Sequence, residues 1–175
     1  MDSAIFYAVN KGVQNTFMDW LMPVVTDYKI WIPVVLLLAA FVIKKDPKKG
    51  LLVVVMAVIA VTASDFINHR VLKELFGRIR PCNVLPDVNL LVGCGKSLSF
   101  PSSHAVNSFT LACVFGFYDR KLFWFTLPPA VLVAFSRVYV GVHYPSDVIV
   151  GALVGAGFGY YAGLLLKKAG VESGT

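Results

Sequence analysis

Three short clusters of polar residues stand at the ends of long apolar runs in this sequence. The first holds Lys73 and Arg80, the second is Pro101-Ser-Ser-His104, and the third runs from Arg137 to Asp147. Arginine binds phosphate oxygens through two parallel hydrogen bonds, and lysine binds them as a compact charge. Histidine can carry a proton or act as a nucleophile near neutral pH. Residues of these types are suited to displacing a phosphoryl group through a phosphohistidine.

The third cluster gives the strongest signal. Gly141 and Pro145 predict a turn between two helices, and His143 lies on that turn. Asp147 follows in the first turn of the next helix, where its carboxylate can accept one imidazole N–H and fix the tautomer. The other nitrogen would then be free to attack phosphorus. An aspartate at a helix N-terminus is also a favourable dipole partner, but acids and histidines buried near a membrane are costly and usually functional.

The second cluster predicts the start of a helix. Serine is a preferred N-cap, and Pro101 just before it blocks backward extension. The free N–H groups of such a helix start attract phosphate, and the hydroxyls of Ser102 and Ser103 could add donors. His104 falls in the first turn, within reach of a departing oxygen that needs a proton. A plain serine cap beside an interfacial histidine is the alternative interpretation.

Three cations are candidates to hold the phosphate: Lys73, Arg80 and Arg137. Together they can neutralise a phosphate monoester and the further charge of its transition state. The alternative is that all three only extend toward lipid headgroups. We prefer that alternative for Arg70 and Arg78, and the catalytic interpretation for the three that neighbour a histidine cluster.

Composition indicates what kind of scaffold positions these clusters. The 175-residue chain is 57% hydrophobic and 15% charged, which predicts an integral membrane protein. We expect an all-α six-helix bundle in one domain spanning 1–175. The net charge of +6 does not indicate nucleic-acid binding, because no basic run is interleaved with exposed aromatics. The predicted helical segments are about 3–25, 29–43, 50–76, 102–117, 122–139 and 146–166.

The first segment is amphipathic and is expected either to cross obliquely or to lie in the interface. It lacks the basic region of a cleaved signal peptide and is expected to stay in the protein. If the segments alternate sides, the loop 44–49, Arg120-Lys121 and Lys167-Lys168 share one face. The positive-inside rule assigns that face to the cytoplasm. The clusters are then on the outer face and both termini inside, with Glu172–Thr175 as a tail.

Glycine recurs at four-residue intervals in the last segment, at Gly151, Gly155, Gly159 and Gly163. A stripe of this kind lets another helix approach closely. We expect it to pack within the bundle, with dimerisation as the less favoured alternative. The oligomeric state itself is not predicted.

Two further patterns lie near the clusters. Asp65, His69 and Lys73 follow at four-residue steps and should share one helix face. We hypothesise a hydrogen-bonded chain that orients Lys73, with ordinary polar packing as the alternative. Cys82 and Cys94 lie in the outer polar stretch, where a disulfide is plausible but not decided by spacing. The sequence has no Cys/His metal-binding pattern.

In order, Lys73-x6-Arg80-Pro81, Pro101-Ser-x-His104 and Ser136-Arg137-x5-His143-x3-Asp147 resemble the three-part signature of the type 2 phosphatidic acid phosphatase superfamily. The resemblance covers about 64–165. It implies a metal-independent phosphatase that uses no cofactor.

The resemblance also implies a role for each residue. His143 would be the nucleophile, Asp147 its partner and His104 the acid for the leaving group. The phosphate would be held by Lys73, Arg80, Ser102 and Arg137, with Ser103 contributing its amide. The family usually has glycine where this chain has Ser103, so the fit of bulky phosphate esters is affected there.

Within the family, the short chain resembles bacterial lipid A, phosphatidylglycerophosphate and undecaprenyl diphosphate phosphatases. The first expectation is a lipid A 1-phosphatase in the bacterial inner membrane with its site facing the periplasm, and undecaprenyl diphosphate is the second candidate substrate. An anion or lipid-phosphate transporter is the rival from another class, although no inverted repeat is visible. A phosphotransferase is the rival within the enzymes.

Overall fold

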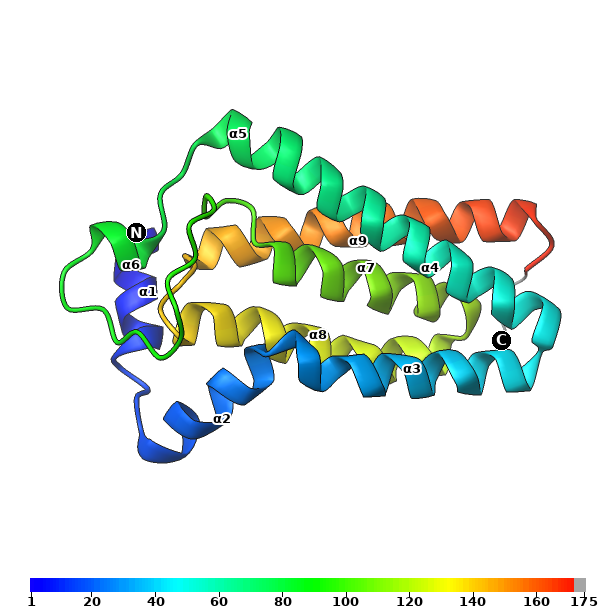
Figure 1. Cartoon of the computed structure of the whole chain (residues 1–175), viewed down its shortest axis with the longest axis horizontal. Helices are drawn as coiled ribbons and strands as arrows, with labels where there is room; N and C mark the ends of the chain where they lie inside the picture. The colour runs from blue at the N-terminus through cyan, green and yellow to red at the C-terminus, as the bar shows by residue number, and fades with distance from the viewer. Residues whose placement is uncertain (172–175) are drawn as a thin grey trace.

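The computed structural model describes residues 1–171, and no strand occurs among them. Figure 1 shows a bundle of long helices with shorter ones at one end. In chain order the elements are α1 (Asp2–Asn10), α2 (Thr16–Thr26), α3 (Tyr28–Lys45), α4 (Pro47–Ile67), the π-helical turn η1 (Asn68–Leu72), α5 (Lys73–Phe76), α6 (Pro81–Val84), α7 (Ser103–Tyr118), α8 (Arg120–Tyr139) and α9 (Pro145–Lys168). The segment interpreted as a tail lies outside the described residues.

The helices have the lengths that a membrane requires. Within the described part of the chain, three are long and apolar enough to cross a bilayer: α4 with its continuation to Val84, α8 and α9. The pair α2 and α3, bent by 58°, makes a fourth if it counts as one span. The 16 residues of α7 reach about 24 Å, less than the hydrocarbon core of roughly 30 Å. α7 packs against α4, α8 and α9 in the middle of the bundle. The predicted all-α membrane fold is confirmed.

The first predicted segment is two helices rather than one. Asn15 caps α2 by accepting a hydrogen bond from the Met18 amide at 3.0 Å. Asn10, at the end of α1, is fully buried. Its side-chain amide donates to the carbonyls of Tyr139 at 2.7 Å and Asn89 at 2.8 Å. Asn15 is therefore a cap and Asn10 an anchor at the point where one continuous helix is predicted.

The N-terminus and the end of α9 lie at opposite ends of the bundle, so the prediction that both ends of the chain share a face is wrong (Figure 1). α1 lies across the end of the bundle and does not run along it beside the long helices. The Ser146 amide, at the start of α9, donates to Asp2 at 3.1 Å. At the other end, an ion pair of 2.6 Å joins Lys45 to Asp119, so the two basic turns lie together as expected.

α4 begins at Pro47, three residues earlier than predicted. Asp46 caps the helix by accepting from the Lys49 amide at 3.0 Å, and proline suits the first helical position. At its other end α4 continues into η1 and α5, which stops at Gly77 with φ of +59°. A π-helical turn adds a residue to the helix and is often found at functional sites.

The glycine stripe packs α9 against α7, as predicted. A Cβ at Gly155 would lie 2.2 Å from the Val106 carbonyl oxygen, and one at Gly159 would lie 2.5 Å from the Cys113 Cβ. Larger residues would therefore push the two helices apart. The close approach of α7 and α9 also brings their N-termini together. There the Ser102 amide donates to the Asp147 carbonyl at 3.0 Å.

Candidate active site

All three polar clusters meet at the end of the bundle that holds the N-terminus. Lys73 comes from α5, and Arg80 directly precedes α6. Ser102, Ser103 and His104 form the start of α7, Arg137 is in the last turn of α8, and His143 and Asp147 bracket the start of α9. Direct hydrogen bonds join these elements.

His143 and Asp147 form a buried pair. The exposed fraction is 1% for His143 and 0% for Asp147. The imidazole Nδ1 lies 3.2 Å from Asp147 Oδ2, which also accepts the Tyr144 amide at 2.9 Å. The carboxylate thus caps α9 and also faces the imidazole. With Nδ1–H donating to the carboxylate, Nε2 carries the free lone pair.

Burial lowers the pKa of His143 below its ordinary value of 6.5, and the positive charges of Arg80 and Arg137 act in the same direction. The hydrogen bond to Asp147 opposes them but does not outweigh burial. The imidazole is therefore neutral at neutral pH. A neutral imidazole is the form that can attack an electrophile.

Arg80 contacts the free nitrogen of His143. Its Nη1 lies 3.0 Å from His143 Nε2 and 3.1 Å from the Val142 carbonyl oxygen. Its Nε and Nη2 donate to the carbonyl and hydroxyl of Ser97, at 2.7 and 2.9 Å. The guanidinium is thus fixed from both sides, beside the atom that would attack phosphorus.

Lys73 is buried at the other side of the loop that precedes α7, with an exposed fraction of 2%. Its Nζ donates to the carbonyls of Leu98 at 2.6 Å and Pro101 at 2.9 Å. A buried ammonium is unfavourable unless carbonyl groups or an anion compensate it. Lys73 therefore brings a positive charge to the start of α7 and ties that start to α5.

Two buried donors at the site have no hydrogen-bond partner among residues 1–171: Ser102 Oγ and Arg137 Nε. Arg137 Nη1 donates to the hydroxyl of Thr26 in α2. The Ser103 hydroxyl accepts from Asn68 Nδ2 at 2.9 Å, so it faces η1. Unpaired buried donors are costly in an apolar surrounding, and a phosphate oxygen would satisfy them.

Sequence reasoning missed two residues of the site. Ser99 donates through its hydroxyl to Asp147 Oδ2, and Arg78 Nη1 donates to Asp147 Oδ1 at 2.8 Å. We expected Arg78 to extend toward headgroups, and that expectation is wrong. One signal could have found it: Arg78 and Arg80 are two apart in a segment without helix, so an extended backbone directs both to the same side.

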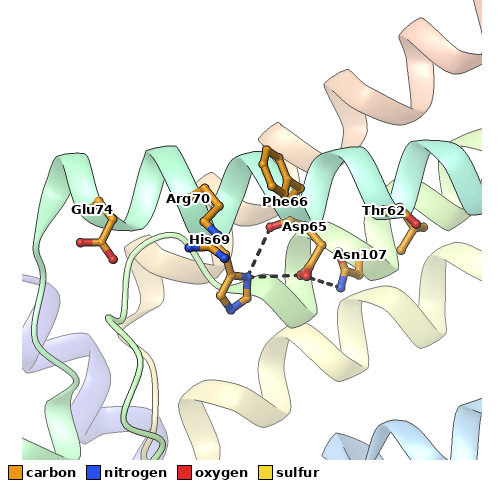
Figure 2. A pocket seen from close by; sticks show the side chains of 8 residues that line it. Thr62, Asp65, Phe66, His69, Arg70, Glu74 and Asn107 are labelled. Carbon is orange, nitrogen blue, oxygen red and sulfur yellow. Dashed lines mark hydrogen bonds and ion pairs between the residues drawn. The ribbon is translucent and has the colours of Figure 1, made fainter.

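The proposed chain from Asp65 through His69 to Lys73 does not form. His69 Nδ1 lies 3.3 Å from the Asp65 carbonyl oxygen and 3.5 Å from its carboxylate (Figure 2). Lys73 turns instead to the carbonyls of the loop before α7. The physical reason is η1, since the inserted residue breaks the four-residue register between His69 and Lys73.

The disulfide considered from the sequence is present. Cys82 and Cys94 are bonded, with 6.2 Å between their Cα atoms. The disulfide links α6 to the segment just before Ser97, whose carbonyl accepts a hydrogen bond from Arg80.

Residues 49–169 match the PAP2 superfamily. The chain belongs to the PAP2 superfamily. It is 34% identical over 158 residues to a lipid A 4′-phosphatase of Bacteroides thetaiotaomicron, covering 85% of this chain and 69% of that protein. It is 38% identical over 128 residues to an undecaprenyl-diphosphatase of Sulfolobus acidocaldarius, covering 73% of this chain and 59% of that protein.

The fold is also similar to solved PAP2 phosphatases. A crystal structure of LpxE from Aquifex aeolicus superposes with a TM-score of 0.73 at 27% identity, over 95% of this chain and 94% of that one. A PAP2-type phosphatidylglycerolphosphate phosphatase from Bacillus subtilis gives 0.73 at 25% identity, over 95% and 85%. The three polar clusters all lie inside 49–169, the region that matches the PAP2 superfamily.

In the part of this PAP2 chain that the structure describes, no three His, Cys, Asp or Glu side chains lie close enough together to hold a metal ion. That the chemistry needs no metal stays a prediction.

Proposed function

We propose that this chain hydrolyses a membrane lipid phosphate through a phosphohistidine on His143. The observation that carries the proposal is the pairing of the two imidazole nitrogens: Nδ1 faces Asp147 at 3.2 Å, and Nε2 faces the Arg80 guanidinium at 3.0 Å. Asp147 orients a neutral imidazole, and the Arg80 guanidinium lies where the phosphate oxygens would bind. Phosphoryl transfer needs this combination of an oriented nucleophile and fixed cations.

The proposed reaction has two steps. His143 Nε2 forms a bond to phosphorus while the bond to the lipid oxygen breaks, and His104 gives that oxygen a proton. The negative charge of a bound phosphate favours the protonated form of His104. A water molecule then attacks the phosphohistidine and passes a proton to His104, which releases inorganic phosphate and restores both histidines.

The phosphate would be held by the residues that surround these histidines. Ser102 Oγ and Arg137 Nε are buried donors without a partner among the described residues, which supports a role for both in binding. Arg80 and Lys73 add positive charge, and Ser103 would contribute its backbone amide. The Ser103 side chain is directed to Asn68, so the serine in place of the usual glycine leaves that amide available.

For the substrate we infer lipid A, with the 1-phosphate as first candidate. The similarity to a lipid A 4′-phosphatase over 85% of this chain supports lipid A. It also makes the 4′-phosphate the alternative position. Undecaprenyl diphosphate is the second candidate, supported by the undecaprenyl-diphosphatases of Sulfolobus acidocaldarius and, at 31% identity, of Bacillus subtilis.

We also propose that the protein resides in the bacterial inner membrane with the site facing the periplasm. The disulfide between Cys82 and Cys94 supports this orientation, because it lies at the site end and disulfides persist in oxidising compartments. Basic residues gather in the turns at the opposite end, as expected for a cytoplasmic face.

The decisive experiment measures phosphate release by the detergent-purified protein with EDTA present. The substrates are lipid A, phosphatidylglycerophosphate, phosphatidic acid and undecaprenyl diphosphate, each beside His143→Ala. We expect release that is lost in the variant. Equal release by the variant, or no release by either protein, would contradict the hydrolase function and favour anion transport. A labelled donor with candidate acceptors separates hydrolysis from phosphotransfer.

A further inference from the structure

A second polar cluster lies beside the active site and is not used by the proposed chemistry. An open cavity of about 800 Å³ on α4, η1, α5 and α7 is lined by Asp65, His69, Arg70, Glu74 and Asn107. Figure 2 shows the side chains of Asp65, His69 and Asn107 directed toward one another, while Phe66 points away. Asn107 Nδ2 donates to Asp65 Oδ1 at 3.2 Å and so joins α7 to α4.

The position of this cluster is costly for a helix that crosses a membrane. The surrounding residues of α4, η1 and α5 include the exposed hydrophobics Phe66, Val71 and Leu75, as expected of a surface in contact with lipid. The side chains of Asp65 and His69 remain 40% and 44% exposed on the same segment. Ionisable groups at such places are rare unless they serve a function. A polar ligand that enters from the membrane side would explain them.

The cluster shares its space with the candidate acid of the reaction. A second cavity of about 760 Å³, mostly apolar, is bounded by α3, α7 and α8. It contacts Ser103 and His104, and it also contacts Asp65, His69 and Asn107. A lipid oxygen that receives a proton from His104 therefore leaves into the space that these three residues line. They are therefore placed to contact the group attached to that oxygen.

The donors and acceptors of the cluster select the chemistry of that group. Asn107 Oδ1 is buried and accepts no hydrogen bond from any residue that the structure describes. Asp65 and Glu74 offer carboxylate oxygens, which accept from hydroxyl and amide N–H groups. Asp65 is the carboxylate that lines both cavities, and it disfavours a negative charge on the group next to the departing oxygen. A sugar that presents hydroxyls and amides, and no charge, next to the departing oxygen satisfies all of these conditions.

We propose that Asp65, His69 and Asn107 form a subsite for the sugar headgroup of the phosphorylated lipid. It favours lipids whose phosphate is carried by an amide- and hydroxyl-bearing sugar over polyprenyl diphosphates, whose leaving group is an anionic polyprenyl phosphate. This inference rests on the proposed phosphatase function and names the substrate class within it.

The test compares Asp65→Asn with the unchanged protein on lipid A, which carries a sugar, and on phosphatidic acid, which does not. Asp87→Asn is the matched control, because Asp87 is exposed at the same end and lines neither of the two cavities. We expect Asp65→Asn to lower kcat/KM for lipid A about tenfold and to change that for phosphatidic acid less than twofold. Undecaprenyl diphosphate should be hydrolysed as well as before, or better.

Two outcomes would overturn the subsite. An equal loss on lipid A and phosphatidic acid would make Asp65 a support of α7 and not a contact of the headgroup. No loss on lipid A, with Asp87→Asn behaving the same, would remove it from recognition altogether. A failed phosphatase looks different, because the unchanged protein would then release phosphate from none of these lipids.

A binding measurement separates recognition from catalysis. In the His143→Ala background, lipid A in detergent micelles should bind at least fivefold more weakly when Asn107→Leu is added. The same addition should leave the binding of phosphatidic acid unchanged. Equal affinities for lipid A with and without Asn107→Leu would contradict the subsite.

Discussion

Arg78 Nη1 lies 2.8 Å from Asp147 Oδ1, on the carboxylate oxygen that His143 does not contact. The same guanidinium binds the Asp2 carboxylate at 2.5 Å and lies over the Tyr144 ring, 3.8 Å from its centroid. The carboxylate that orients the imidazole is therefore itself held by α1. Arg78 connects the first turn of the protein to the residue that we propose as nucleophile.

Replacing Arg78 tests this connection. We expect Arg78→Gln to lower kcat by about 10- to 100-fold, the usual effect of removing a group that orients a catalytic residue. KM should change little, because Arg78 is bonded to carboxylates and not to the phosphate site. Lys96→Gln, an exposed cation in the same outer stretch, is the control. Similar kcat values for the two variants would contradict the role of Arg78.

Acid should destabilise the protein through His143. Because its folded-state pKa is below the ordinary value of 6.5, the unfolded chain binds a proton that the folded chain does not. The free energy of unfolding therefore rises with pH up to about 6.5 and falls as the solution is acidified below that value. His143→Asn should flatten this dependence. Thermal unfolding in detergent between about pH 4.5 and 7.5 measures it, and an unchanged slope in the variant would count against a neutral buried imidazole.

Loss of the disulfide should affect both stability and activity. Cys82 and Cys94 are 12 residues apart, and closing a loop of that size stabilises a fold by about 3 kcal/mol. We expect Cys82→Ser with Cys94→Ser to lower the unfolding temperature and to reduce kcat/KM severalfold, since the loop carries the Ser97 contacts of Arg80. Cys113→Ser, at the one free cysteine of the described residues, is the control and should change neither. Full activity in the double variant would show that the loop holds Arg80 without its crosslink.

Two glycines of α9 offer a matched pair. Gly155→Ala places a methyl group 2.2 Å from the Val106 carbonyl oxygen and should destabilise the protein by about 1–3 kcal/mol. At Gly157 a Cβ meets nothing within 4 Å, so Gly157→Ala should be neutral or stabilise by up to about 1 kcal/mol through helix propensity. Denaturation in mixed micelles compares them. Equal effects at both positions would argue against the intramolecular packing of the stripe.

Much of the site could be predicted because its residues stand at helix ends. A turn between α8 and α9 places His143 four residues before Asp147, and the Pro-Ser-Ser start of α7 places His104 in a first turn whatever the rest of the chain does. Such local geometry follows from caps and turns alone. The convergence of the clusters then needs only a bundle in which helices alternate direction.

The features that sequence analysis missed lie in parts of the chain that have no repeating hydrophobic pattern. Ser99 and Arg78 lie in the irregular stretch between α5 and α7, where no repeat indicates which way a side chain points. The register between His69 and Lys73 failed because a single inserted residue in η1 has no sequence signature. One amphipathic pattern runs through α1 and α2 and predicts a single helix, whereas the buried Asn10 and the Asn15 cap mark the turn between them.

The contact between Asp2 and Ser146 spans 144 residues, and that interval contains every helix after α1 except α9 itself. It can close only after the start of α9 has reached the end of the bundle where α1 lies. Until then Arg78 has no Asp147 to hold, and the carboxylate that faces His143 lacks its second partner. A chain caught halfway through membrane insertion is therefore catalytically silent, and lipid hydrolysis begins only when assembly of the bundle is complete.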